Sequence, residues 1–163
     1  MDKDRLRERI IQLTRDLILI ESTDDLPSER RRCFQLMRNH LEEVPGLNIR
    51  MAEKNGYESL IALPEGKDVP EILLCGHLDV VKHIEPGSYR SEIRDGKIYG
   101  PGAGDMKGQL AIMIELIRHL VLERFKVHLA TRLAGASRIE DQDQLPIQVA
   151  RLEDGFSADA DFD

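Results

Sequence analysis

The chain has 163 residues, of which 41% are hydrophobic and 33% are charged. This composition is typical of a soluble globular domain with a core of its own, and it excludes a disordered chain. No apolar run approaches the roughly 20 residues that span a membrane, and the N-terminus lacks the apolar core of a signal peptide. We therefore expect a cytoplasmic protein without a membrane partner, in which Cys33 and Cys75 are reduced thiols.

The net charge of −7 is concentrated at the C-terminal end. Residues 140–163 contain eight acidic residues and a single basic residue, so the rest of the chain is electrically balanced. A protein that binds nucleic acid needs a basic face. The charge distribution therefore excludes nucleic acid as a partner.

Two amphipathic helices are predicted at the N-terminal end. Pro27 and Ser28 are typical of a helix start, and the apolar stripe that follows predicts a second helix, which Pro45 and Gly46 end. Apolar residues at alternating spacings of four and three predict the first helix, over residues 3–21. Its stripe consists of Leu6, Ile10, Leu13, Leu17 and Ile20.

The middle of the chain has the pattern of strands. Residues 48–51 and 59–63 are predicted strands, with a turn at Asn55-Gly56 between them. The short and continuously apolar run at 71–76 is typical of a buried central strand. An Asp-Gly turn between two short strand-like segments then predicts a β-hairpin over 91–99.

The last predicted helix covers residues 108–123 and is apolar on nearly every side, so we expect it to be buried against a sheet. Residues 127–134 are a further candidate strand. Helices that alternate with buried strands indicate an α/β fold, a layered domain with a mostly parallel mixed sheet flanked by helices. We place this domain at residues 1–126 and expect the acidic segment 127–163 to be divergent and poorly ordered.

His77 and Asp79 stand two residues apart at the carboxyl end of the predicted strand 71–76. Their side chains therefore point to the same side, toward the crevice where α/β sheets hold ligands. A neutral imidazole is a good zinc ligand, and a carboxylate beside it can fix its tautomer. Taken alone, such a pair is more often an ordinary surface contact at the end of a strand.

Asp105 follows a bend with three glycines and precedes the apolar helix. A carboxylate here is ordinarily a helix N-cap, but three glycines exceed what a cap requires and indicate a backbone folded tightly around a ligand. One carboxylate can bridge two metal ions. A phosphate site is disfavoured, because Lys107 is followed by glycine instead of the serine or threonine of a P-loop. Lys107 itself is expected on the solvated surface.

Together the two segments resemble the M20 family of metallopeptidases and amidohydrolases, which includes carboxypeptidases, aminoacylases, acetylornithine deacetylases and succinyl-diaminopimelate desuccinylases. Residues 76–81 (GHLDVV) are similar to the family's first motif and residues 99–108 (YGPGAGDMKG) to its second. The order, the spacing and the intervening hairpin also match. The resemblance implies that His77 binds one zinc ion, that Asp79 orients it, and that Asp105 bridges two zinc ions before a cis peptide bond.

The family next supplies a Glu-Glu-x-Gly segment, with one glutamate as general base and the other as zinc ligand. Glu140 and Asp141 are the nearest equivalents here, as candidate base and candidate ligand, although no glycine follows them closely. The family's remaining ligands and its lid domain would lie beyond residue 163. We therefore expect the N-terminal part of an M20 catalytic domain, which is an incomplete zinc-peptidase-like domain.

The resemblance implies zinc-dependent hydrolysis of an amide bond in an N-acyl amino acid or a short peptide. Two zinc ions would activate a water molecule, and a glutamate would move its proton. The alternative is a catalytically inactive remnant that acts as a binding or regulatory module. Without the rest of its sheet, the helix at 108–123 would expose apolar surface, which favours self-association into a homo-oligomer.

Overall fold

The computed structural model describes residues 2–65, 72–83, 85, 87–122 and 127–132. Each segment predicted as a helix or a strand is found as one, with ends that differ by a few residues. None of the helices in the described ranges is long and apolar enough to cross a membrane. The elements in chain order are α1 (Lys3–Ile18), α2 (Pro27–Glu42), β1 (Leu47–Lys54), β2 (Tyr57–Pro64), β3 (Ile72–His77), β4 (Glu92–Arg94), β5 (Lys97–Tyr99), α3 (Lys107–Leu122) and β6 (Val127–Arg132).

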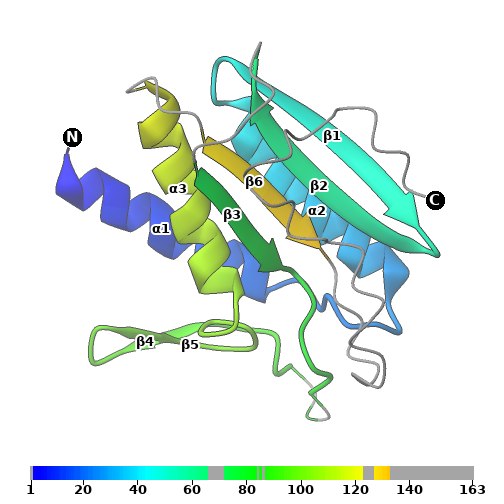
Figure 1. Ribbon diagram of the computed structural model, residues 1–163. Helices are drawn as coiled ribbons and strands as arrows, with labels where there is room; N and C mark the ends of the chain where they lie inside the picture. Colours follow the sequence, from blue (N-terminus) through cyan, green and yellow to red (C-terminus); the bar gives the residue numbers. More distant parts are fainter. Residues whose placement is uncertain (1, 66–71, 84, 86, 123–126, 133–163) are drawn as a thin grey trace.

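The main sheet is mixed, with the strand order β1-β2-β6-β3 (Figure 1). The β1–β2 and β2–β6 pairs are antiparallel, and the β3–β6 pair is parallel. The expectation of a mostly parallel sheet is therefore wrong for the described strands. Parallel neighbours need a long crossover, which here contains α3, whereas β1 and β2 are joined by the tight Asn55-Gly56 turn. Both turn residues have positive φ, at 55° and 80°, as a type I′ hairpin requires.

β6 lies inside the sheet, between β2 and β3. The candidate strand at 127–134 is thus found over Val127–Arg132. β6 is part of this sheet although it follows residue 126, where the sequence analysis places the end of the domain. The rest of the acidic segment, residues 133–163, lies outside the described residues.

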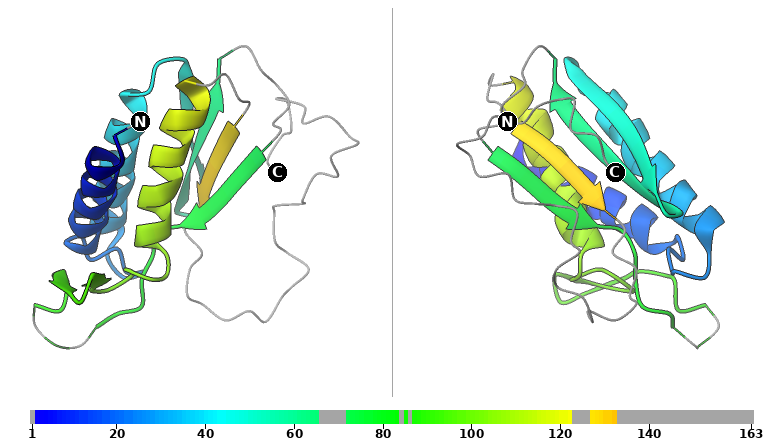
Figure 2. Two further views of the ribbon diagram at one scale, coloured as in Figure 1. Left: turned by 90° about the vertical axis from the view of Figure 1, so that its left-hand side faces the viewer. Right: turned by 45° about the vertical axis from the view of Figure 1, so that its right-hand side comes forward.

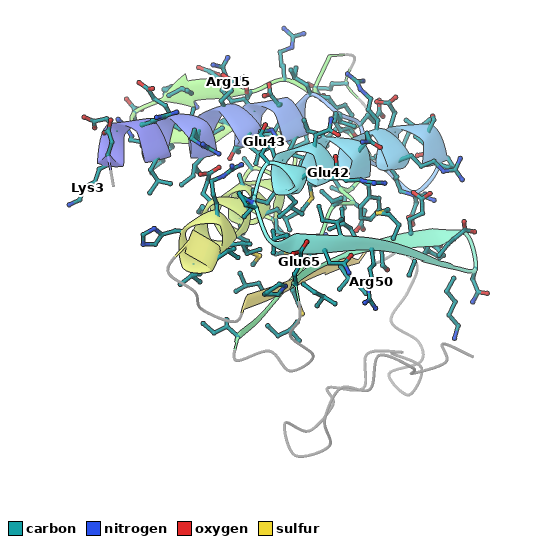
Figure 3. All side chains as sticks on the ribbon, turned by 90° about the horizontal axis from the view of Figure 1, so that it is seen from above. Lys3, Arg15, Glu42, Glu43, Arg50 and Glu65 are labelled. Atoms are coloured by element: carbon teal, nitrogen blue, oxygen red, sulfur yellow. The ribbon has the colours of Figure 1, made fainter. Side chains whose placement is uncertain are left out.

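All three helices lie on the same side of the main sheet, as Figure 2 shows. α2 contacts β1 and β2, α3 contacts β3 and β6, and α1 packs on α3. Figure 3 shows Arg50 of β1 on the opposite side, which no described helix covers. The core between the helices and the sheet is formed by residues that are almost fully buried, among them Leu13, Leu17, Phe34, Met37, Leu41, Leu60, Leu110, Ile114 and Ile117.

α3 is buried along one side only. Leu110, Ile114 and Ile117 face the core, whereas Ile112 and Leu116 are 51% and 40% exposed. The prediction of a helix packed against a sheet is confirmed, and so is the expectation that part of its apolar surface stays exposed. Polar contacts also tie the helices together, because the buried Glu115 of α3 accepts a hydrogen bond of 2.9 Å from Arg9 of α1.

Candidate metal centre

The two segments that carry His77 and Asp105 meet at the carboxyl end of β3. His77 is the last residue of β3, and Asp105 stands two residues before the start of α3. The His77 Nε2 atom lies 3.2 Å from the Asp105 Oδ1 atom, although 28 residues separate them in the chain. The structure therefore brings together the two side chains that the sequence predicts to converge.

The other nitrogen of the His77 ring is fixed by Asp79. His77 Nδ1 lies 3.2 Å from the backbone carbonyl oxygen of Asp79 and 3.4 Å from its carboxylate Oδ1. A carbonyl oxygen and an ionised carboxylate can only accept hydrogen bonds, so both nitrogens of the His77 ring face acceptor atoms. In a neutral ring one of the two nitrogens presents a lone pair to its oxygen neighbour, a contact that is repulsive unless a proton or a cation lies between the two atoms.

Asp79 is a buried carboxylate that faces the imidazole. Burial raises the pKa of its carboxyl group above the ordinary value, and the neighbouring His77 ring acts in the opposite direction. Its buried Oδ1 makes no hydrogen bond within the described part of the chain. A positive charge on the ring or on a cation bound to it would stabilise this carboxylate.

The spacing of the two donor atoms fits neighbouring ligands of one zinc ion. With Zn–N and Zn–O bonds of about 2.0–2.1 Å, two ligands of a tetrahedral ion stand roughly 3.3 Å apart, and the observed distance is 3.2 Å. The His77 side chain is 30% exposed and that of Asp105 is 87% exposed, so both are open to an ion from solvent. The described residues contain no cluster of three or more His, Cys, Asp or Glu side chains that could hold a metal. They contain two candidate ligands, His77 and Asp105, and a closed zinc shell needs four.

The Asp79 segment is held by Ser22, which follows α1 and is fully buried. Ser22 Oγ donates a hydrogen bond of 2.6 Å to the Leu78 carbonyl oxygen, and the Val80 backbone N–H donates one of 3.1 Å to the Ser22 carbonyl oxygen. These two bonds fix the backbone on both sides of Asp79. They also hold the carbonyl that orients the His77 ring.

The Asp105 segment is a compact bend. The Lys107 backbone N–H donates to the Gly102 carbonyl oxygen at 2.8 Å. Gly102 has a φ of +75°, and a Cβ atom there would lie 2.8 Å from Val80 Cγ1, so the bend packs directly against the segment after His77. The cis peptide bond that the resemblance implies after Asp105 is present between Asp105 and Met106.

Lys107 is not on the surface, and the expectation that solvent surrounds it is wrong. Its side chain is fully buried, and Nζ donates to the carbonyl oxygens of Leu17 at 2.9 Å and Ile20 at 2.7 Å. Burial lowers the pKa of this ammonium group. The sequence carries no signal for this position, because α3 also has an exposed face on which a lysine could lie.

Glu140 and Asp141, the candidate base and the candidate third ligand, lie outside the described residues. Their roles stay predictions. The backbone of β6 nevertheless bears on them, because β6 runs parallel to β3 and the Cα atoms of His77 and Arg132 are paired. The chain therefore leaves β6 beside the proposed ligands.

Comparison with known proteins connects this geometry to a family. Residues 73–133 match the model of peptidase family M20/M25/M40. A succinyl-diaminopimelate desuccinylase from Ruthia magnifica subsp. Calyptogena magnifica is 30% identical over 65% of this chain and 28% of its own length. A cysteinylglycine-S-conjugate dipeptidase from Corynebacterium striatum is 29% identical over 96% of this chain and 36% of its own length.

A solved structure shows the same fold. An M20 family metallo-carboxypeptidase from Sulfolobus solfataricus superposes with a TM-score of 0.64 at 18% identity, over 83% of this chain and 31% of that chain. The chain thus spans well under half the length of these relatives. His77, Asp79 and Asp105 all fall within residues 73–133, the part of the chain that matches peptidase family M20/M25/M40.

Proposed function

We propose that the chain takes part in the zinc-dependent hydrolysis of an amide bond in an N-acyl amino acid or a short peptide. The observation that carries the proposal is the 3.2 Å approach of His77 Nε2 to Asp105 Oδ1, with the opposite ring nitrogen held by Asp79. The family match supports hydrolysis, and the printed names of the relatives, a desuccinylase and a dipeptidase, support small amide substrates.

Each described residue has a separate role in this proposal. His77 would bind the metal through Nε2, the nitrogen beside Asp105, while Nδ1 faces the oxygens of Asp79. Asp79 fixes the ring and balances the positive charge that builds up on it. Asp105 would bind through its carboxylate, whose Oδ1 lies beside His77 Nε2. Bound zinc lowers the pKa of a water molecule toward 7 and polarises the substrate carbonyl.

The proposal extends to Glu140 as general base and Asp141 as a further ligand. Support comes from the register of β6, whose last residue is paired with His77. At about 3.3 Å per residue, the eight residues from Arg132 to Glu140 can reach roughly 26 Å at most, which covers the distance to the two described ligands. A glutamate there would take a proton from the attacking water and deliver it to the leaving amine.

Zinc titration of the full chain tests the proposal. The wild-type chain should take up zinc in fixed stoichiometry, and His77→Ala and Asp105→Ala should each weaken the affinity at least tenfold. His83→Ala is the matched control, because His83 is an exposed histidine in the following loop. Cys75→Ser controls for the exposed thiol of β3, since thiolates also bind zinc.

The proposal fails if the wild type and both ligand variants take up zinc equally weakly. Hydrolysis is then measured on N-succinyl amino acids and on dipeptides, with and without a chelator. Zinc binding that depends on His77 but supports no hydrolysis would favour the alternative, an inactive binding module. Such a result would leave the metal ligands in place and remove the catalytic role.

A further inference from the structure

Residues 17–22, at the end of α1 and just after it, contact both segments that carry the proposed zinc ligands. We propose that Lys107 and Ser22 are positioning residues, which fix Asp105 and His77 relative to each other by binding to this common support. The inference rests on the proposed zinc site. It concerns residues that touch neither a metal nor a substrate.

The first attachment is the pair of hydrogen bonds made by Ser22. Its hydroxyl group binds the Leu78 carbonyl oxygen and its own carbonyl oxygen binds the Val80 N–H. Leu78 directly follows His77, and both Leu78 and Ser22 are completely buried. The support is therefore hydrogen-bonded to the chain at Leu78, one residue after His77.

The second attachment is the Lys107 ammonium group. Nζ reaches the carbonyl oxygens of Leu17 and Ile20, at the end of α1 where the helix dipole favours a positive charge. Lys107 stands two residues after Asp105, and its backbone N–H closes the bend on Gly102. The same side chain thus joins the bend to the support.

Packing also joins the support to the bend. Leu17, Ile18 and Ser22 are fully buried, and Ile20 is 3% exposed. A Cβ atom on Gly100 would lie 2.8 Å from Ile18 Cγ2, so the start of the bend rests directly on α1. Two metal ligands must be held to within about 0.5 Å for tight binding, and exposed side chains such as Asp105 depend on their backbone for that precision.

The test compares the wild type with Lys107→Met, Ser22→Ala and the double variant. Methionine keeps the length of the lysine stem and removes its ammonium group. Leu41→Ala is the matched control, because Leu41 is a fully buried core residue of α2. In the described part of the chain it makes no hydrogen bond to the segments that carry His77 and Asp105. Urea unfolding gives the stability of each chain.

Two readouts then separate positioning from stability. The first is the affinity for Co²⁺ and the visible spectrum of the bound ion, at a temperature where every chain is folded. Lys107→Met and Ser22→Ala should each weaken the Co²⁺ affinity at least tenfold and change the spectrum. The fold-loss of affinity in the double variant should differ from the product of the two single fold-losses, because both residues bind the same support. Leu41→Ala should lose stability and keep both the wild-type affinity and the wild-type spectrum.

The second readout needs no metal. In chains labelled with ¹⁵N-histidine, the ring resonances of His77, assigned with His77→Gln, should shift in Lys107→Met and Ser22→Ala but not in Leu41→Ala. Unchanged His77 resonances in both variants would overturn the inference, and so would an equal shift in Leu41→Ala. Failure of the wild-type chain to bind Co²⁺ through His77 would instead overturn the proposed function. Should Lys107→Met fail to fold, Ser22→Ala gives the same two readouts.

Discussion

Replacing Gly102 by alanine measures how tightly the Asp105 bend is packed. Gly102 has a φ of +75°, and an alanine Cβ would lie 2.8 Å from Val80 Cγ1 and 3.0 Å from Lys107 Cδ. The left-handed conformation costs an L-residue roughly 1–2 kcal/mol. The clash adds about 1–3 kcal/mol, because Val80 is stiff and Lys107 is held at its ammonium end. Gly102→Ala should therefore lower the free energy of unfolding by about 2–5 kcal/mol.

Two other glycines separate these contributions. Gly56 has a φ of +80°, and an alanine Cβ there would meet no atom within 4 Å, so Gly56→Ala should cost the conformational part alone, roughly 1–2 kcal/mol. Gly104 lies in the same bend as Gly102, without a left-handed φ and without a close neighbour. Gly104→Ala should therefore be neutral or slightly stabilising, because alanine restricts the unfolded chain.

The assay is equilibrium unfolding in urea, followed by far-ultraviolet circular dichroism at fixed protein concentration. The difference between the Gly102→Ala and Gly56→Ala free energies isolates the packing contribution, provided that the urea dependence is unchanged. Equal losses for these two variants would refute the reasoning. They would mean that the bend does not press on Val80 and Lys107.

Two further predictions concern the core. At pH 8 the native chain should react with one equivalent of a thiol reagent, at the exposed Cys75, because Cys33 is fully buried and burial raises the pKa of its thiol to about 11. A second equivalent should react only after unfolding. Reaction of two equivalents with the native chain would contradict the packing of α2. Glu115→Ala should lower the free energy of unfolding by about 1–3 kcal/mol, because Arg9 loses the carboxylate it is paired with and Arg118 keeps its other ion pair, with Glu43. An unchanged urea midpoint would show that this buried carboxylate contributes nothing.

The helices and strands could be predicted because their signals are local. The apolar stripe that includes Leu13 and Leu17 is buried as its spacing requires, and the Asn55-Gly56 turn marks a hairpin by its own residue types. The order of the strands in the sheet has no such local signal, because the residues of β6 do not indicate that it pairs with both β2 and β3. That choice is made by long-range packing, which explains why the predicted parallel character was wrong.

The site divides in the same way. His77, Asp79 and Asp105 stand out because their side chains are of the types that bind metals and stand at informative spacings. Lys107 and Ser22 escape a sequence analysis, because both bind backbone carbonyl oxygens, which every residue possesses. A contact to a carbonyl oxygen leaves no trace in the residue type of its partner.

The end of α1 also explains how His77 and Asp105 meet without belonging to paired strands. The connection between β3 and α3 covers residues 78–106 and includes the β4–β5 hairpin. The covalent chain alone does not fix the distance between the two ends of so long a loop, and closing it costs entropy that rises only slowly with length. Hydrogen bonds at Leu78, Val80 and Lys107 tie both ends of the loop to residues 17–22. His77 and Asp105, the two proposed ligands, are thereby placed by residues at the end of α1 that touch neither side chain's donor atoms.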